Sequence, residues 1–186
     1  MFLKRIEIQG FKSFADKTVL DFLPEQKGKQ SITVIVGPNG SGKSNVADAM
    51  RWVMGEQSMK MLRGKKSEDI IFSGSENKGQ MSMASVFITF DNTDKKAPID
   101  YEELVIGRRL YRSGESEYII NGHDARLIDI HILLAQAQTG SGAHGIIGQG
   151  MIDKMILQTA DERKDFLTKR QVSKNFRSNA IRPCFV

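Results

Sequence analysis

The sequence reads Gly37-Pro38-Asn39-Gly40-Ser41-Gly42-Lys43-Ser44 between an apolar run and a run with helical periodicity. This octapeptide fits the pattern G-x-x-x-x-G-K-[ST]. Glycines let the backbone curl so that its N–H groups point at phosphate oxygens, and a helix N-terminus adds about half a positive charge there. In such a loop Lys43 reaches the β- and γ-phosphates, while the Ser44 hydroxyl binds Mg²⁺. The stretch predicts an ATP site with Mg²⁺, and the alternative is a glycine-rich turn that binds nothing.

The segments on either side of the octapeptide favour the binding interpretation. Residues 32–36 form a short apolar, β-branched run, which is typical of a strand buried on both faces. Residues 43–54 carry apolar side chains at helical spacing, and Gly55 follows as a natural stop. The expected order of strand, glycine loop and helix is the context that a phosphate-binding loop requires.

The rest of the chain predicts further strands and helices. We expect strands over residues 2–9, 18–22, 84–90, 103–111 and 117–120, and helices over residues 127–137 and from 151 onward. The last three strands follow one another through short turns, so they form an antiparallel insert. The predicted fold is α/β: a mixed sheet with the phosphate-loop helix and an antiparallel β insert.

Three weaker motifs are interpreted as structural. Residues 140–145 match G-x-G-x-x-G, but a helical pattern precedes them where a dinucleotide fold needs a strand. Asp91 ends an apolar strand as a Mg²⁺-organising Asp would, yet Asn92 follows where a catalytic Glu is needed, so a strand end entering a turn is favoured. The three histidines lack metal-ligand spacing and are interpreted as surface or loop residues.

Charge is distributed unevenly along the 186 residues. The chain has 27 basic and 22 acidic residues, a net charge of +5. Five basic residues and no acid lie in residues 168–186, so the remaining 22 basic residues balance all the acids in residues 1–167. The body is formally neutral, and its global charge offers no argument for a DNA-binding face.

Composition also excludes several classes of protein. The 40% hydrophobic and 26% charged content is typical of one globular domain. The longest apolar stretch is shorter than the roughly 20 residues that a membrane span needs, and the start of the chain has no secretory signal pattern. Cys184 is the single cysteine, which excludes an internal disulfide framework. We expect a cytoplasmic protein without membrane contact.

Several separate motifs occur together in the order found in one family. They are Phe11-Lys12-Ser13-Phe14, the octapeptide at 37–44, Arg51-Trp52-Val53-Met54-Gly55-Glu56-Gln57-Ser58, Leu62-Arg63-Gly64, Ile71-Phe72-Ser73-Gly74-Ser75, residues 109–118 and Ile146-Ile147-Gly148-Gln149-Gly150. Over residues 1–167 the chain resembles the N-terminal head lobe of bacterial structural-maintenance-of-chromosomes (SMC) proteins. The resemblance implies the N-terminal half of a P-loop ABC-type ATPase head.

The resemblance also implies roles for individual residues. The nucleotide would be contacted by Lys12, Ser13, Gly37, Pro38, Asn39, Gly40, Ser41, Gly42, Lys43, Ser44 and Asn45. Gln149 stands at the family's Q-loop position, where its amide oxygen would join Ser44 on Mg²⁺. Arg63 stands at the arginine-loop position, where it would reach nucleotide phosphate across an engaged dimer or contact DNA. Lys66 and Arg126 fall near positions that face DNA, with sequence-independent phosphate contacts.

The family's hydrolytic machinery is incomplete here. The sequence has no serine-glycine-glycine-glutamine signature, no Walker B Asp-Glu pair and no long heptad arm. Phosphoryl transfer needs positioning, metal and an oriented water together. The resemblance therefore implies ATP binding without hydrolysis by this chain alone, with a C-terminal head lobe as partner. In the parent protein two heads would dimerise on ATP and act on DNA at the chromosome.

Residues 168–186 are expected to be a separate basic tail, because the family pattern stops at residue 167. Codons for residues 167–173 read one nucleotide out of phase can spell a sequence of the family's kind, so we predict a frameshift; a natural short product with a disordered tail is the alternative. Two other functions stay open: a head fragment of a RecN- or RecF-like DNA repair ATPase, or a non-catalytic interaction fragment.

Overall fold

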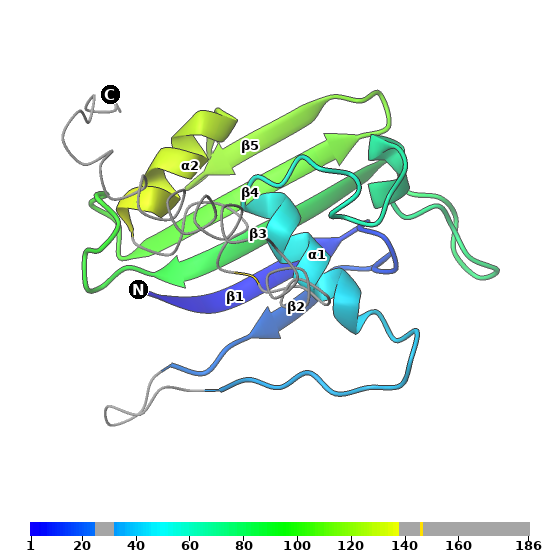
Figure 1. Ribbon diagram of the computed structural model, residues 1–186, viewed down its shortest axis with the longest axis horizontal. Coiled ribbons are helices and arrows are strands. Elements are labelled where there is room, and N and C mark those ends of the chain that lie inside the picture. Colours follow the sequence, from blue (N-terminus) through cyan, green and yellow to red (C-terminus); the bar gives the residue numbers. More distant parts are fainter. Residues whose placement is uncertain (25–31, 138–145, 147–186) are drawn as a thin grey trace, which may run out of the picture.

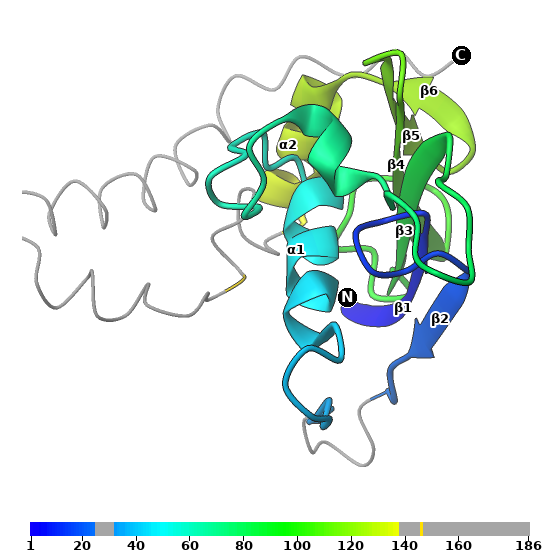
Figure 2. The same ribbon diagram turned by 90° about the vertical axis from the view of Figure 1, so that its right-hand side faces the viewer.

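The fold is one antiparallel sheet with helices across one of its faces (Figures 1 and 2). The computed structural model describes residues 1–24, 32–137 and 146. The strands are β1 (Phe2–Gln9), β2 (Thr18–Asp21), β3 (Met83–Asp91), β4 (Glu103–Tyr111), β5 (Ser116–Ile120) and β6 (His123–Ala125). The helices are α1 (Lys43–Val53), the 3₁₀ helix η1 (Ser67–Ile70) and α2 (Leu127–Gln136).

The six strands run in the order β2-β1-β3-β4-β5-β6, and every neighbouring pair is antiparallel. Alternation of side chains sends every second residue to one face. Ile6 and Ile8 of β1, Ile88 of β3 and Ile106 of β4 are fully buried on that face. Ile88 lies opposite Ile6 on one side and Ile106 on the other, which forms a continuous apolar row across the sheet.

Helix α1 covers this apolar row. Its buried apolar residues Val46, Ala49, Trp52 and Val53 follow the helical spacing that the sequence predicts. The ring of Trp52 lies 5.3 Å from that of Phe11, centroid to centroid, and both side chains are fully buried. The sheet thereby fixes the axis of α1, and with it the position of the loop at the start of the helix.

A buried arginine binds carbonyl oxygens at the C-terminal end of α1. Arg108 of β4 lies between the rings of Trp52 and Tyr118, 4.7 Å from each centroid. Its Nη1 donates to the carbonyl oxygens of Trp52 and Glu56, at 3.0 Å each. Trp52 is in the last turn of α1, where free carbonyl groups favour a cation, and Glu56 lies just beyond the helix. Burial of the guanidinium lowers the pKa of Arg108.

The predicted strand over residues 32–36 does not form. None of these residues belongs to a strand, and Ile32 and Val36 are 88% and 87% exposed. The prediction of a mixed sheet is also wrong: in the described residues every pair of neighbouring strands is antiparallel. Residues 32–36 have the composition of a strand that is buried on both faces, but they pair with no strand of the described sheet.

Most other expectations about the fold are confirmed. The predicted strands at 2–9, 18–22, 84–90, 103–111 and 117–120 and the helices at 43–54 and 127–137 match elements within two residues. The expected antiparallel insert is part of the main sheet, and β6 and η1 were not predicted. The expected helix from residue 151 lies outside the described residues. No helix in the described part of the chain is long and apolar enough to cross a membrane.

Asp91 and Asn92 form the turn that was favoured over a metal-binding strand end. The Asp91 carboxylate accepts from the backbone N–H of Thr93 at 3.1 Å and from its hydroxyl at 2.7 Å. These bonds lower the pKa of Asp91. Asn92 is fully buried and bonds to the backbone of Ala97 and Tyr101. Both side chains therefore serve the turn after β3.

Candidate nucleotide-binding site

Two glycines of the loop adopt backbone angles that favour glycine. Gly40 and Gly42 have φ angles of 83° and 86°, in the left-handed region that other residues adopt only with strain. Gly42 is the N-cap of α1, so the loop leads directly into the first helical turn. A Cβ atom on Gly42 would lie 2.9 Å from the Ser13 hydroxyl oxygen. Glycine is needed at this position both for its φ angle and for the close approach of Ser13.

Lys43 folds its side chain back over this loop. Its Nζ donates to the carbonyl oxygens of Gly37 and Pro38, at 2.6 Å each. Nζ also lies 3.4 Å from the Ser41 hydroxyl oxygen. All three acceptors are uncharged, and within residues 1–24, 32–137 and 146 no carboxylate pairs with Lys43. The positive charge therefore adds to that of the helix N-terminus. The two together make a site suited to an anion such as phosphate.

Ser44 and Asn45 follow on the first turn of α1. Ser44 is exposed, and its hydroxyl makes no hydrogen bond within the described part of the chain, so its oxygen is accessible to a cation. Asn45 Nδ2 donates to the Ser13 hydroxyl at 2.8 Å. Ser13 therefore lies beside the first turn of α1. Gln149, the other expected Mg²⁺ ligand, lies outside the described residues.

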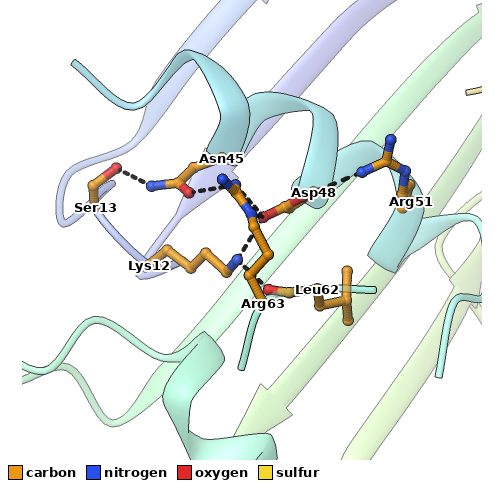
Figure 3. A network of polar contacts seen from close by, with 7 residues as sticks. All are labelled: Lys12, Ser13, Asn45, Asp48, Arg51, Leu62 and Arg63. Atoms are coloured by element: carbon orange, nitrogen blue, oxygen red, sulfur yellow. Dashed lines mark hydrogen bonds and ion pairs between the residues drawn. The ribbon is translucent and has the colours of Figure 1, made fainter. Parts of the chain in front are cut away.

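Around Asp48 of α1 lies a charged group that we name the Asp48 cluster: Lys12, Asp48, Arg51 and Arg63 (Figure 3). Asp48 Oδ2 accepts from Lys12 Nζ at 2.5 Å and from Arg63 Nη2 at 2.5 Å. Its Oδ1 accepts from Arg51 Nη1 at 3.4 Å. Lys12 Nζ also donates to the Leu62 carbonyl oxygen. Lys12, which was expected to contact the nucleotide, thus forms an ion pair with Asp48 in this structure.

Unusual backbone angles orient two members of this cluster. Lys12 and Arg63 have φ angles of 48° and 55°, which cost energy for residues with a Cβ atom. The Lys12 N–H donates to the Ile70 carbonyl oxygen at 2.7 Å, which ties the turn after β1 to η1. The strained positions bring a lysine from one loop and an arginine from another onto a single helical carboxylate.

Asp48 and Arg51 were not identified as site residues from the sequence. Both are buried on α1 at spacing i, i+3, within an otherwise apolar stripe. Two opposite charges that face inward together on a predicted helix are the signal that could have found them.

The two residues expected to face DNA differ in whether their side chains form an ion pair within the described structure. Lys66 is exposed, and its side chain has no ion pair among the described residues. The backbone N–H groups of Lys65 and Lys66 donate to Asp69, and these bonds lower the pKa of Asp69. Arg126 is also exposed but is paired with Asp129 at 3.1 Å, which raises the pKa of Arg126.

The sheet, the helix across it and the loop before that helix define a class: the N-terminal part of a P-loop ATPase head. The chain belongs to the RecF/RecN/SMC N terminal domain family, which it matches over residues 2–141. It is 52% identical to the chromosome partition protein Smc of Clostridium kluyveri and 48% identical to that of Bacillus subtilis, over 88% of this chain in each case. The chain spans 13% of the length of these relatives.

Solved structures agree with this assignment. One similar chain, described under "Structural biochemistry of ATP-driven dimerization and DNA stimulated activation of SMC ATPases", is 37% identical with a TM-score of 0.81. The match covers 90% of this chain and 98% of the other. An SMC head bound to the C-winged helix domain of ScpA is 39% identical with a TM-score of 0.78, covering 86% of this chain and 48% of that one. The resemblance to SMC heads stated above is thus confirmed.

RecF is a more distant structural relative. A solved RecF chain with ATP is 18% identical with a TM-score of 0.56, and it covers 95% of this chain. At that identity the likeness extends to the fold alone. The identities therefore favour the SMC branch of the family over the repair ATPases.

Proposed function

We propose that this chain is the ATP- and Mg²⁺-binding N-terminal lobe of a chromosome-partition SMC head. The observation that carries the proposal is the Lys43 ammonium, which lies over the glycine loop with only uncharged acceptors among the described residues. A triphosphate would supply the negative charge that the described residues do not offer to Lys43. The loop N–H groups and the first turn of α1 would hold the phosphates.

Mg²⁺ would be held by Ser44, whose exposed hydroxyl suits a hard cation, with Gln149 as the second protein ligand. When bound, the ion neutralises charge on the β- and γ-phosphates. In this proposal the residues around the loop bind and orient the nucleotide, and the sequence has no Walker B Asp-Glu pair that would orient the attacking water. We therefore propose that this lobe binds ATP and does not hydrolyse it alone.

The partner is a C-terminal head lobe, and residues 32–36 support this proposal. This apolar run leads into the phosphate loop and is largely exposed, with Val34 at 73%. A strand added beside it would take up its backbone groups and cover its side chains. In the assembled protein two heads would dimerise on ATP, in the cytoplasm at the chromosome. Lys66 and Arg126 would contact DNA phosphates without sequence preference.

Nucleotide titration of the full 186-residue chain tests the proposal. Lys43→Ala should weaken ATP binding about tenfold or more, because it removes a charge-assisted contact to the triphosphate. Lys95→Ala is the matched control, since Lys95 is an exposed lysine whose ammonium donates to the Asp100 carbonyl in the turn after β3. Equal ATP affinity in all three proteins would reject the site.

Co-expression tests the partner lobe. With the C-terminal head lobe of a related SMC protein, the amides of residues 32–36 should become protected from hydrogen exchange, and ATP turnover should appear. Turnover by this chain alone that depends on Lys43 would show that the lobe is catalytically complete. Unchanged exchange at residues 32–36 would argue against the proposed docking of a strand there.

A further inference from the structure

The cations around Asp48 differ in how deeply they are buried. The side chains of Lys12 and Arg51 are 12% and 9% exposed, while that of Arg63 is 53% exposed. The Asp48 side chain itself is 2% exposed. A carboxylate so buried is stable only with a charged partner. Lys12 and Arg51 already meet that need from inside the structure, whereas Arg63 is attached from the solvent side.

Arg63 can therefore leave Asp48 at a lower cost than either of the other two cations. Its departure would break two hydrogen bonds to Asp48 Oδ2, from Nε at 3.1 Å and from Nη2 at 2.5 Å, but the carboxylate would keep two cations and water would solvate the half-exposed guanidinium. Lys12 and Arg51 are themselves buried, so either one separated from Asp48 would be a buried cation without its partner. Of the cations around Asp48, Arg63 is the detachable one.

The released guanidinium would remain beside Asn45, on the first turn of α1 that follows the phosphate loop of the same chain (Figure 3). Arg63 Nη2 already donates to Asn45 Oδ1 at 3.2 Å, and Asn45 is on the first turn of α1. Asn45 in turn bonds to Ser13, whose hydroxyl lies against Gly42. This contact path ties Arg63 to its own P-loop, rather than to one in another head.

We propose that Asp48 is a positioning residue that holds Arg63 beside the phosphate loop and yields it to the triphosphate when ATP binds. The inference rests on the proposed function, because the competing anion is the nucleotide's own phosphate. A phosphate offers a planar guanidinium the same bidentate acceptor geometry as a carboxylate. ATP binding thus exchanges one Arg63 partner for another, and the strength of the Asp48 contact sets part of the ATP affinity.

Removing the charge of Asp48 while keeping its shape tests the exchange. Asp48→Asn should tighten ATP binding about three- to fivefold, because Arg63 no longer has to be withdrawn from a competing partner. Arg63→Ala should weaken ATP binding, and Asp48→Asn should have no effect on affinity once Arg63 is alanine. Asp21→Asn is the control: it makes the same change in net charge and removes the ion pair, 2.6 Å long, between Asp21 and the exposed Arg5.

A second measurement uses the unmutated chain and so does not depend on the stability of Asp48→Asn. In protein labelled with ¹⁵N-arginine, the Arg63 Nε–H signal is assigned by its loss in Arg63→Lys. ATP should shift this signal, and AMP, which lacks the β- and γ-phosphates, should shift it much less. Arg5 should not respond to either nucleotide.

The outcomes separate the two proposals. ATP binding that does not depend on Lys43 would reject the proposed function. Lys43-dependent binding with an unmoved Arg63 signal would overturn only the role of Asp48. Folded Asp48→Asn with unchanged or weaker ATP affinity, judged by native near-ultraviolet circular dichroism, would overturn it as well. An effect of Asp48→Asn that persists without Arg63 would assign the role to Lys12 and count against the proposal.

Discussion

Residues 32–36 and strand β3 have similar side chains but differ in secondary structure and in burial. Both are runs of apolar and β-branched residues, and both predict a buried strand. Strand β3 lies between β1 and β4, and Ile88 at its centre is fully buried. Ile32 is 88% exposed and belongs to no strand. The difference shows that an apolar composition allows a segment to form a buried strand. Whether the segment is buried depends on having neighbouring strands to pair with.

The largest expected effect is a matched pair of Ile→Ala substitutions in these two regions. Ile88→Ala should lower the free energy of unfolding by about 2–5 kcal/mol, because it leaves a cavity under α1. Ile32→Ala should change it by less than about 0.5 kcal/mol, as is usual for exposed sites. Urea denaturation of both variants measures the difference. Comparable losses would mean that residues 32–36 are packed in solution, and the contrast would disappear.

A smaller effect separates the glycine loop from the turn between β4 and β5, where Gly114 lies. Gly42→Ala forces an alanine to φ 86° and against Ser13, so it should cost about 2 kcal/mol and weaken ATP binding. Gly114 has φ 90° with open space around a Cβ, so Gly114→Ala should cost about 1 kcal/mol from strain alone and leave ATP binding intact. Denaturation and nucleotide titration of both variants test this. Equal ATP affinities would mean that the loop is not fixed by its junction with α1.

The smallest effect concerns an exposed ion pair at the start of α2. Arg126 lowers the pKa of Asp129 by hydrogen bonding, so the contribution of this pair is present above the unfolded pKa of an Asp. It is lost as the pH falls through the lower, folded pKa. Asp129→Asn should therefore cost less than about 1 kcal/mol at pH 7, and the difference from the unmutated chain should shrink as the pH falls below the unfolded pKa of an Asp and disappear below the folded pKa. Denaturation at pH 7 and at a series of acidic pH values measures it. A cost that is independent of pH would assign the effect to the helix cap rather than to the charge.

Local patterns predict most of this fold. Alternation in β1 and β3 and the helical spacing of α1 are properties of short stretches, and each stretch meets its partners within the described chain. The glycine loop is equally local, since its φ angles and its junction with α1 follow from adjacent residues. The strand over residues 32–36 could not be judged in this way, because pairing depends on segments far away or on another chain.

The polar part of the site was less predictable. Arg63 was expected at the nucleotide from a resemblance, but its contact with Asp48 joins residues on separate elements. Arg108 occupies an inward-facing position of β4, where the alternation of the strand predicts an apolar side chain. Its burial is explained by its contacts with the end of α1. Such residues depend on tertiary neighbours, which a periodic pattern does not reveal.

Trp52 has a practical consequence, because it is the chain's only tryptophan. It is 1% exposed, and it lies one turn along α1 from Asp48, against the Arg108 guanidinium and the Phe11 ring. All intrinsic indole emission therefore originates at the contact between α1 and the sheet. A shift in its wavelength would report displacement of that helix without a label, and anisotropy decay would time the motion.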